Sequence, residues 1–228
     1  MNILYEDNHI IVVVKPHNIP TQADSSQDAD MLTKVKEYIK DKYNKPGNVY
    51  VGLVHRLDRP TGGVMVFAKT SKAASRLTEQ IKSGDMTKKY LAVTVGTPRD
   101  KRAKLVNYLL KNERTNTVQV VPQLTTGAKY AELSYQVLDN TDKVALVDVD
   151  LITGRSHQIR VQLKTIGCPI YGDVKYGGDT LAKGHNLALW AYHLRFTHPT
   201  TKQVMTFKVY PNTDVTPFNV FKTTIEKI

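Results

Sequence analysis

The chain has 228 residues, 41% of them hydrophobic, which is enough to bury the core of a globular protein. It carries 32 Lys and Arg against 21 Asp and Glu, and this formal net charge of +11 favours polyanionic partners, nucleic acid before acidic membrane surfaces. The single cysteine, Cys168, excludes a disulfide framework and a Cys-based zinc site.

No basic amphipathic helix or long apolar segment is present, so a membrane partner is not expected. The N-terminus lacks the pattern of a signal peptide, which predicts a cytoplasmic protein. Because the sequence shows no repeat, low-complexity tract or linker, we expect one domain over residues 1–228.

The N-terminal part alternates between strand-like and helix-like segments. Residues 2–15 predict two strands joined by a tight turn. Apolar residues recur at helical spacing over 30–43, after an acidic N-cap, and a second helix is predicted from Ser71 to a C-terminal glycine, Gly84. A strand follows at 88–96.

Strands dominate the second part of the chain. Residues 100–114 are basic and predicted to be irregular, either a phosphate-facing surface or simply a solvated charged face. Three strand-like runs without intervening helices, ending near residue 151, favour antiparallel pairing. A short helix is expected from about Ser156 to Gly167, then another helix or strand near 187–199 and a final strand.

Residues 55–68, HRLDRPTGGVMVFA, hold the main candidate for chemistry. Asp58 ends an approach strand and is followed by a turn rich in proline and glycine. If the strand continues, Arg56 shares a face with Asp58, and a carboxylate beside a cation stays ionised and oriented, as a nucleophile requires. The alternative is an ordinary turn in which Asp58 bonds its own backbone.

Two later positions strengthen the chemical interpretation. Tyr90 follows Lys88 and Lys89 and is either a core or interface residue or a stacking platform for a base. Arg160 lies beside the apolar stripe of its helix, and a buried arginine needs a partner: a carbonyl, a structural acid, or Asp58. The histidines show no metal-ligand spacing, and no phosphate loop or hydrolase elbow is present.

Three stretches in this order resemble blocks of the RluA-type family of RNA pseudouridine synthases. They are HRLDRPTGGVMVFAKT at 55–70, KKYLAV at 88–93, and LITGRSHQIRVQL at 151–163 continuing into GCPIYGDVKYG. The opening YEDNHIIVVVKPHNIPTQ and the closing LWAYHLRFTHP are similar to its terminal signatures. The resemblance therefore covers most of the chain.

The resemblance implies an α+β catalytic domain with a central, mostly antiparallel mixed sheet flanked by helices, and a basic cleft for RNA. It implies isomerisation of uridine to pseudouridine in ribosomal or transfer RNA, without cofactor or metal, by a protein that we expect to be a monomer. Asp58 would be the catalytic aspartate, Tyr90 would stack on the flipped base, and Arg160 would pair with Asp58. The expected RNA contacts are Arg56, Lys88, Lys89 and Arg155.

Some positions depart from the family pattern, and these concern substrate detail rather than chemistry. They are the run Thr61-Gly62-Gly63, Gln162 and Trp190. The S4 RNA-binding domain of many relatives is expected to be missing. Two other functions remain open: a catalytically idle RNA-binding module, and a nucleoside hydrolase, for which Asp173 is the nearest second carboxylate.

Overall fold

The computed structural model describes residues 1–177 and 184–228. The chain forms two compact units: residues 1–87 together with 193–209, and residues 88–192 together with 210–228. We call them unit 1 and unit 2 and describe each by itself.

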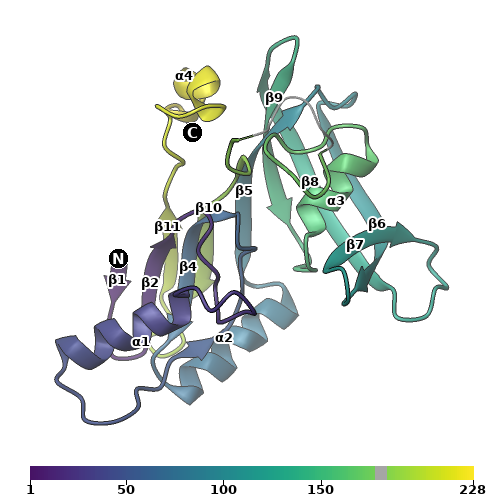
Figure 1. Cartoon of the computed structure of the whole chain (residues 1–228). Coiled ribbons are helices and arrows are strands. Elements are labelled where there is room, and N and C mark those ends of the chain that lie inside the picture. The colour runs from purple at the N-terminus through teal and green to yellow at the C-terminus, as the bar shows by residue number, and fades with distance from the viewer. Residues whose placement is uncertain (178–183) are drawn as a thin grey trace. The chain divides into compact units, whose positions relative to one another are not determined.

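Unit 1 is built on strands in the order β1-β2-β4-β10, with β11 beside β10 and the short β3 beside β4, and the pairs β1–β2, β2–β4, β3–β4 and β10–β11 are antiparallel (Figure 1). The second half of β10 belongs to this unit, and its first half to unit 2. The strands are β1 (Asn2–Glu6), β2 (Ile10–Lys15), β3 (Gly52–Leu53), β4 (Gly62–Ala68), β10 (Leu189–Thr197) and β11 (Val204–Lys208).

Both helices of unit 1 begin and end as the sequence predicts. Helix α1 (Met31–Lys42) is capped by the Asp30 carboxylate, which accepts a hydrogen bond from the Thr33 N–H at 3.0 Å. Helix α2 (Ser71–Ser83) ends at Gly84, whose φ of 82° is left-handed and suits glycine. Apolar residues of α2 pack on one face of β2 and β4, against alternate residues such as Val12 and Val66, and every residue of both strands is buried.

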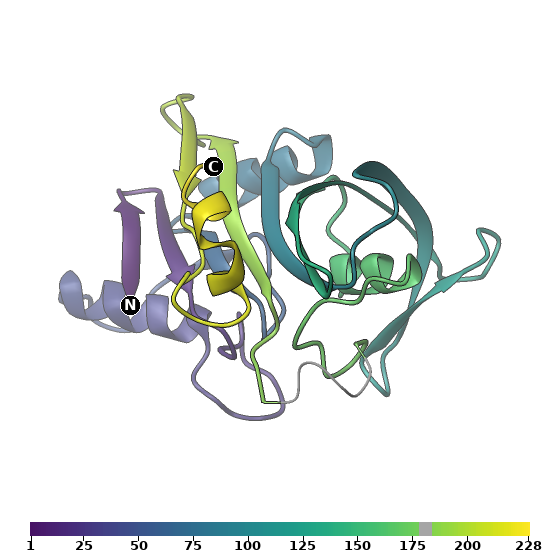
Figure 2. The same ribbon diagram turned by 90° about the horizontal axis from the view of Figure 1, so that it is seen from above.

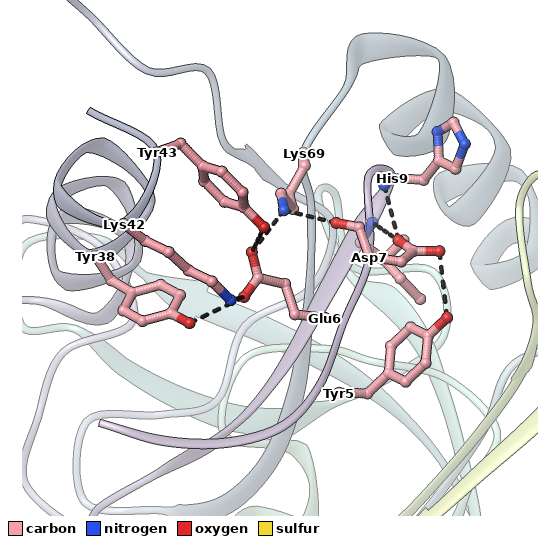
Figure 3. Close-up of polar contacts among 9 residues, drawn as sticks. Tyr5, Glu6, Asp7, His9, Tyr38, Lys42, Tyr43 and Lys69 are labelled. Carbon is pink, nitrogen blue, oxygen red and sulfur yellow. Dashed lines mark hydrogen bonds and ion pairs between the residues drawn. The ribbon is translucent and has the colours of Figure 1, made fainter. Parts of the chain in front are cut away.

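A buried carboxylate ties the end of α1 to the sheet of unit 1 (Figure 3). Glu6 of β1 accepts hydrogen bonds from Lys69 Nζ at 2.6 Å, Lys42 Nζ at 2.7 Å, Tyr43 Oη at 2.9 Å and Tyr38 Oη at 3.0 Å. Burial alone would raise the pKa of Glu6, but these four donors outweigh it and lower the pKa to about 2.

Unit 2 is an antiparallel sheet in the order β5-β9-β8-β6-β7, which curves around helix α3 (Figure 2). Side chains of α3, β6, β7 and β8 form its core with Tyr176. The elements are β5 (Thr87–Val95), β6 (Arg102–Asn112), β7 (Thr117–Val121), β8 (Lys129–Asn140), β9 (Val144–Leu151), α3 (Gln158–Thr165), a 3₁₀ turn at Phe218–Phe221 and α4 (Lys222–Ile225).

The expectation of irregular structure at 100–114 is wrong, because most of this segment is strand β6. Its outward side carries Arg102, Lys104 and Val106, which are exposed, while the alternate residues are partly buried. Pairing with β8 on one side and β7 on the other satisfies its backbone, so a sequence rich in charge is still extended.

Helix α3 is shorter than predicted and begins at Gln158 rather than near Ser156. His157 has φ 52°, a left-handed conformation that interrupts the helix at its N-terminal end. The α+β class and the mostly antiparallel pairing are confirmed. Among the described residues, no helix has both the length and the apolar content to cross a bilayer.

Candidate active site

Asp58 lies half-buried in unit 1, in the loop of residues 54–61 between β3 and β4. Its carbonyl accepts a hydrogen bond from the Thr61 N–H at 2.9 Å, which closes a turn immediately before β4. Gly63 then has φ 128°, a conformation that L side chains rarely adopt, so glycine is required there. The sequence correctly marks a turn here, but the approach strand that it predicts up to Asp58 already ends at Leu53.

Side chains from the segment after β2 hold the backbone of this loop. Thr21 Oγ1 donates to the Leu57 carbonyl at 2.8 Å and accepts from the Leu57 N–H at 3.2 Å. His17 Nδ1 donates to the Pro60 carbonyl at 2.7 Å. The residue before the catalytic candidate and the residue two positions after it are therefore held by side chains that the sequence analysis did not single out.

Lys15, the last residue of β2, is a buried cation in contact with this loop that the sequence analysis did not single out. It is fully buried (0% exposed), and its Nζ donates to the carbonyls of Pro16 at 3.0 Å and Arg59 at 2.9 Å. Burial lowers the pKa of Lys15 to about 7, and the charge of Asp58 opposes this shift. The only signal in the sequence is a lysine that ends an unbroken apolar strand.

The expected pairing of Arg56 with Asp58 on one strand face rests on a strand that is not there. Strand β3 ends at Leu53, so side-chain alternation does not extend to these residues, and Arg56 is exposed. Arg59 is the arginine of this loop that pairs with acids, with Asp28 at 2.5 Å and Asp24 at 3.5 Å. These exposed pairs contribute little stability.

Arg160 is buried on α3 in unit 2, and the structure shows its structural partner. Its Nε and Nη2 donate to the Asp173 carboxylate at 2.8 and 2.7 Å, a two-point ion pair. Asp173 is fully buried and also accepts from the N–H groups of Lys175 and Tyr176, both at 3.0 Å. A carboxylate held in this way is poorly suited to be the acid or base of a hydrolase.

Tyr176 extends this network on the other side of Arg160. The guanidinium lies 5.0 Å from the centre of the Tyr176 ring, and the Tyr176 hydroxyl contacts His157 Nδ1 at 2.7 Å. The hydroxyl also accepts from the Val118 N–H at 2.8 Å, which connects α3 to β7. Arg160 is thus held in one orientation by both an ion pair and an aromatic ring.

Tyr90 lies on β5 with its side chain buried, opposite Val149 of β9. Lys88, two residues earlier, is also buried, whereas Lys89 is on the other face and lies 3.6 Å from Asp148. Arg155 is exposed, and its Nε donates to the Tyr130 carbonyl at 2.8 Å. Of the four expected RNA contacts, Lys88 alone is buried.

Together these groups provide a carboxylate on a fixed loop, a buried guanidinium, an aromatic side chain and a buried ammonium, with basic residues exposed nearby in sequence. Nucleophilic or base chemistry on a nucleic-acid base needs groups of these types. Within the described residues, no His, Cys, Asp or Glu groups cluster in threes to hold a metal ion.

Comparison with known proteins shows the family to which this chain belongs. The RNA pseudouridylate synthase family matches residues 9–165, a span that includes Asp58, Tyr90 and Arg160. The chain belongs to this family. The resemblance inferred from the sequence blocks is confirmed.

The relatives include ribosomal large subunit pseudouridine synthase C of Vibrio vulnificus, which is 34% identical over 210 residues. That match covers 89% of this chain but 63% of the relative, so the chain spans under two thirds of the Vibrio protein. An uncharacterized RNA pseudouridine synthase of Mycoplasma pneumoniae is also 34% identical, over 91% of this chain and 66% of its own length.

A solved structure, human RNA pseudouridylate synthase domain containing 4, has a similar fold. It gives a TM-score of 0.79 at 25% identity and covers 99% of this chain and 93% of its own. Human RNA pseudouridylate synthase domain containing 1 gives a TM-score of 0.72 at 23% identity, which supports the fold alone.

Proposed function

We propose that this protein is an RNA pseudouridine synthase that isomerises uridine in ribosomal or transfer RNA, and that residues 1–228 act as one catalytic domain. The observation that carries this proposal is the loop of Asp58, fixed on both sides by Thr21 and His17, inside the stretch that matches the family. A carboxylate presented on a rigid loop is typical of a catalytic group. The large-subunit name of the Vibrio relative favours ribosomal RNA, and either RNA substrate would place the protein in the cytoplasm.

Asp58 is the proposed catalytic group. The reaction breaks the bond from C1′ to N1 of the uracil, turns the ring, and joins C1′ to C5. Asp58 can act as a nucleophile at the sugar, as a nucleophile on the pyrimidine ring, or as a base at the sugar.

Arg160 is proposed to pair with Asp58 as well as with Asp173. A guanidinium has five N–H donors in a planar fork, and Asp173 engages those of Nε and Nη2. In this proposal Asp173 fixes the guanidinium and the other donors orient the catalytic carboxylate.

Tyr90 is proposed to stack on the target base, which must leave its helix to react. Flipping a nucleotide costs roughly a few kcal/mol, and stacking on an aromatic ring returns about 1–3 kcal/mol. The net charge of +11 supplies further affinity through phosphate contacts, for which Arg56, Lys89 and Arg155 are the proposed residues. Binding should therefore weaken as salt is raised.

The test compares Asp58→Asn with Asp41→Asn, which alters an exposed acid on α1. Pseudouridines are mapped in ribosomal and transfer RNA from cells lacking this protein, complemented with each variant. Asp58→Asn should restore no site while its RNA affinity stays within about twofold of wild type, and Asp41→Asn should restore all sites.

Several outcomes would contradict the proposal. Wild-type conversion by Asp58→Asn would remove the catalytic role of this residue. Release of free uracil would indicate a hydrolase, and RNA binding without any conversion by the wild type would indicate a binding module.

A further inference from the structure

Lys88 on β5 of unit 2 is a buried cation that the mechanism above does not use. Lys88 is 7% exposed, and no hydrogen bond or ion pair to its ammonium is found within residues 1–177 and 184–228. Its Nζ faces Gly154, where an added Cβ would lie 3.5 Å away. Burial lowers the pKa of Lys88, as expected where a charge has lost water without gaining a partner.

The alternation of β5 places the side chain of Lys88 next to that of Tyr90 on the strand. Lys88 and Tyr90 are both buried and share one face of the strand, two residues or about 6.5–7 Å apart. The residue opposite Tyr90 on β9 is Val149, so the surroundings on this face are apolar. Lys89 lies on the other face with Asp148, and it is a matched lysine in a different environment.

The reaction creates a negative charge on the base that would stack on Tyr90. When the C1′–N1 bond breaks, its electron pair stays on the ring, and the charge is shared with the carbonyl oxygens O2 and O4. If Asp58 instead adds to C6 of the ring, the electron pair of the C5–C6 double bond moves toward the carbonyl oxygen O4. C5 then bonds to C1′ and loses its proton, N1 takes one up, and nothing is oxidised or reduced.

We propose that the Lys88 ammonium binds a carbonyl oxygen of the flipped uracil and stabilises the negative charge that develops on the ring. This proposal rests on the proposed function, because it needs the base to stack on Tyr90. It assigns Lys88 to the base rather than to a phosphate, since the phosphates of a flipped nucleotide stay on the solvated backbone whereas this ammonium is buried. A cation that is mostly shielded from water and lies where negative charge develops lowers the energy of the transition state effectively.

The test uses Lys88→Met and Lys88→Gln, with Lys143→Met as the control, which alters an exposed lysine in the turn between β8 and β9. The substrate is ribosomal and transfer RNA labelled with [5-³H]uridine in cells lacking this protein, because loss of the C5 proton releases tritium. For both Lys88 variants, the single-turnover rate at saturating RNA should fall about 100-fold while RNA affinity stays within about twofold. The melting temperature of Lys88→Met should rise by about 2–4 °C, because an unpaired buried charge is gone.

Lys143→Met should keep its rate within about threefold of wild type, because its side chain is exposed and lies outside the proposed site. Equal rates for Lys88→Met and Lys143→Met would overturn the proposal. A lower RNA affinity with a normal saturated rate would make Lys88 a phosphate contact and overturn it too, as would unfolding of both Lys88 variants. If the wild type itself releases no more tritium than Asp58→Asn, the proposed function fails first and this inference falls with it.

Discussion

Lys15 and Lys88 are both buried lysines, yet their surroundings differ in one respect. In each, burial lowers the pKa of the ammonium. Lys15 Nζ is bound by two backbone carbonyls, and one of them belongs to the loop of Asp58. For Lys88 no such acceptor is found among the residues that the structure describes.

This difference distinguishes Lys15, whose ammonium binds backbone groups of the fold, from Lys88, whose ammonium we expect to bind a ligand. Carbonyl oxygens replace part of the water that Lys15 loses, so its burial is compensated within the fold. The burial of Lys88 is compensated only when another group supplies an acceptor. Arg160 is a third buried cation. Its lost hydration is replaced most completely of the three, because the Asp173 carboxylate binds it at two points.

The largest effect is expected from removing the compensation of Arg160. Asp173→Ala should lower the free energy of unfolding by about 3–5 kcal/mol, because it leaves a buried guanidinium without its carboxylate. Asp173→Asn, which retains one acceptor oxygen, should lose less. Urea unfolding followed by circular dichroism measures both, and a change below about 1 kcal/mol for Asp173→Ala would show that burial here does not require the pair.

A smaller effect should appear in the pH dependence of Lys15. Its pKa in the folded state is about 7, below the ordinary lysine value of 10.5, so between these values the unfolded chain binds more protons and stability rises with pH. Between pH 6 and pH 9 the wild type should gain roughly 2–3 kcal/mol relative to Lys15→Met. The same comparison with Lys36→Met, an exposed lysine on α1, should be flat.

Urea unfolding at the two pH values measures this difference directly. If the stability difference between wild type and Lys15→Met does not change with pH, then Lys15 is solvated like Lys36. The contrast with Lys88 would then lose its basis.

The smallest effect concerns Glu6, a buried anion whose donors are all provided by the fold. Its pKa of about 2 lies below the ordinary glutamate value of 4.5, so its contribution to stability is present above pH 4.5 and is lost as the pH falls toward 2. Glu6→Gln should reduce stability by about 1–2 kcal/mol at pH 7, and the deficit should shrink at pH 3.

Exposed Glu79 on α2 offers a control, because Glu79→Gln should change stability little at either pH. Thermal unfolding of the two variants at pH 7 and pH 3 checks the prediction. A deficit for Glu6→Gln that is the same at both pH values would mean that its hydrogen bonds, and not its charge, stabilise the fold.

Local chemistry in the sequence determined the elements and the chemical candidates. The period of the apolar residues predicts α1 and α2, and the caps at Asp30 and Gly84 give their ends because capping depends only on neighbouring residues. Turn chemistry likewise marks the loop that presents Asp58. The high charge of residues 100–114 led to a wrong prediction of irregular structure. Pairing with two neighbouring strands makes this segment extended despite its charged residues.

The tertiary structure alone decided which groups meet. Lys15 reaches the carbonyl of Arg59, and Arg160 reaches Asp173. Nothing local distinguishes these lysine and arginine side chains from exposed ones, since burial and partner are set by how distant segments pack. The same holds for Lys88 and Lys89, which are adjacent in the sequence. The pleat of β5 turns their side chains to opposite faces of the sheet, so Lys88 is buried and Lys89 pairs with Asp148.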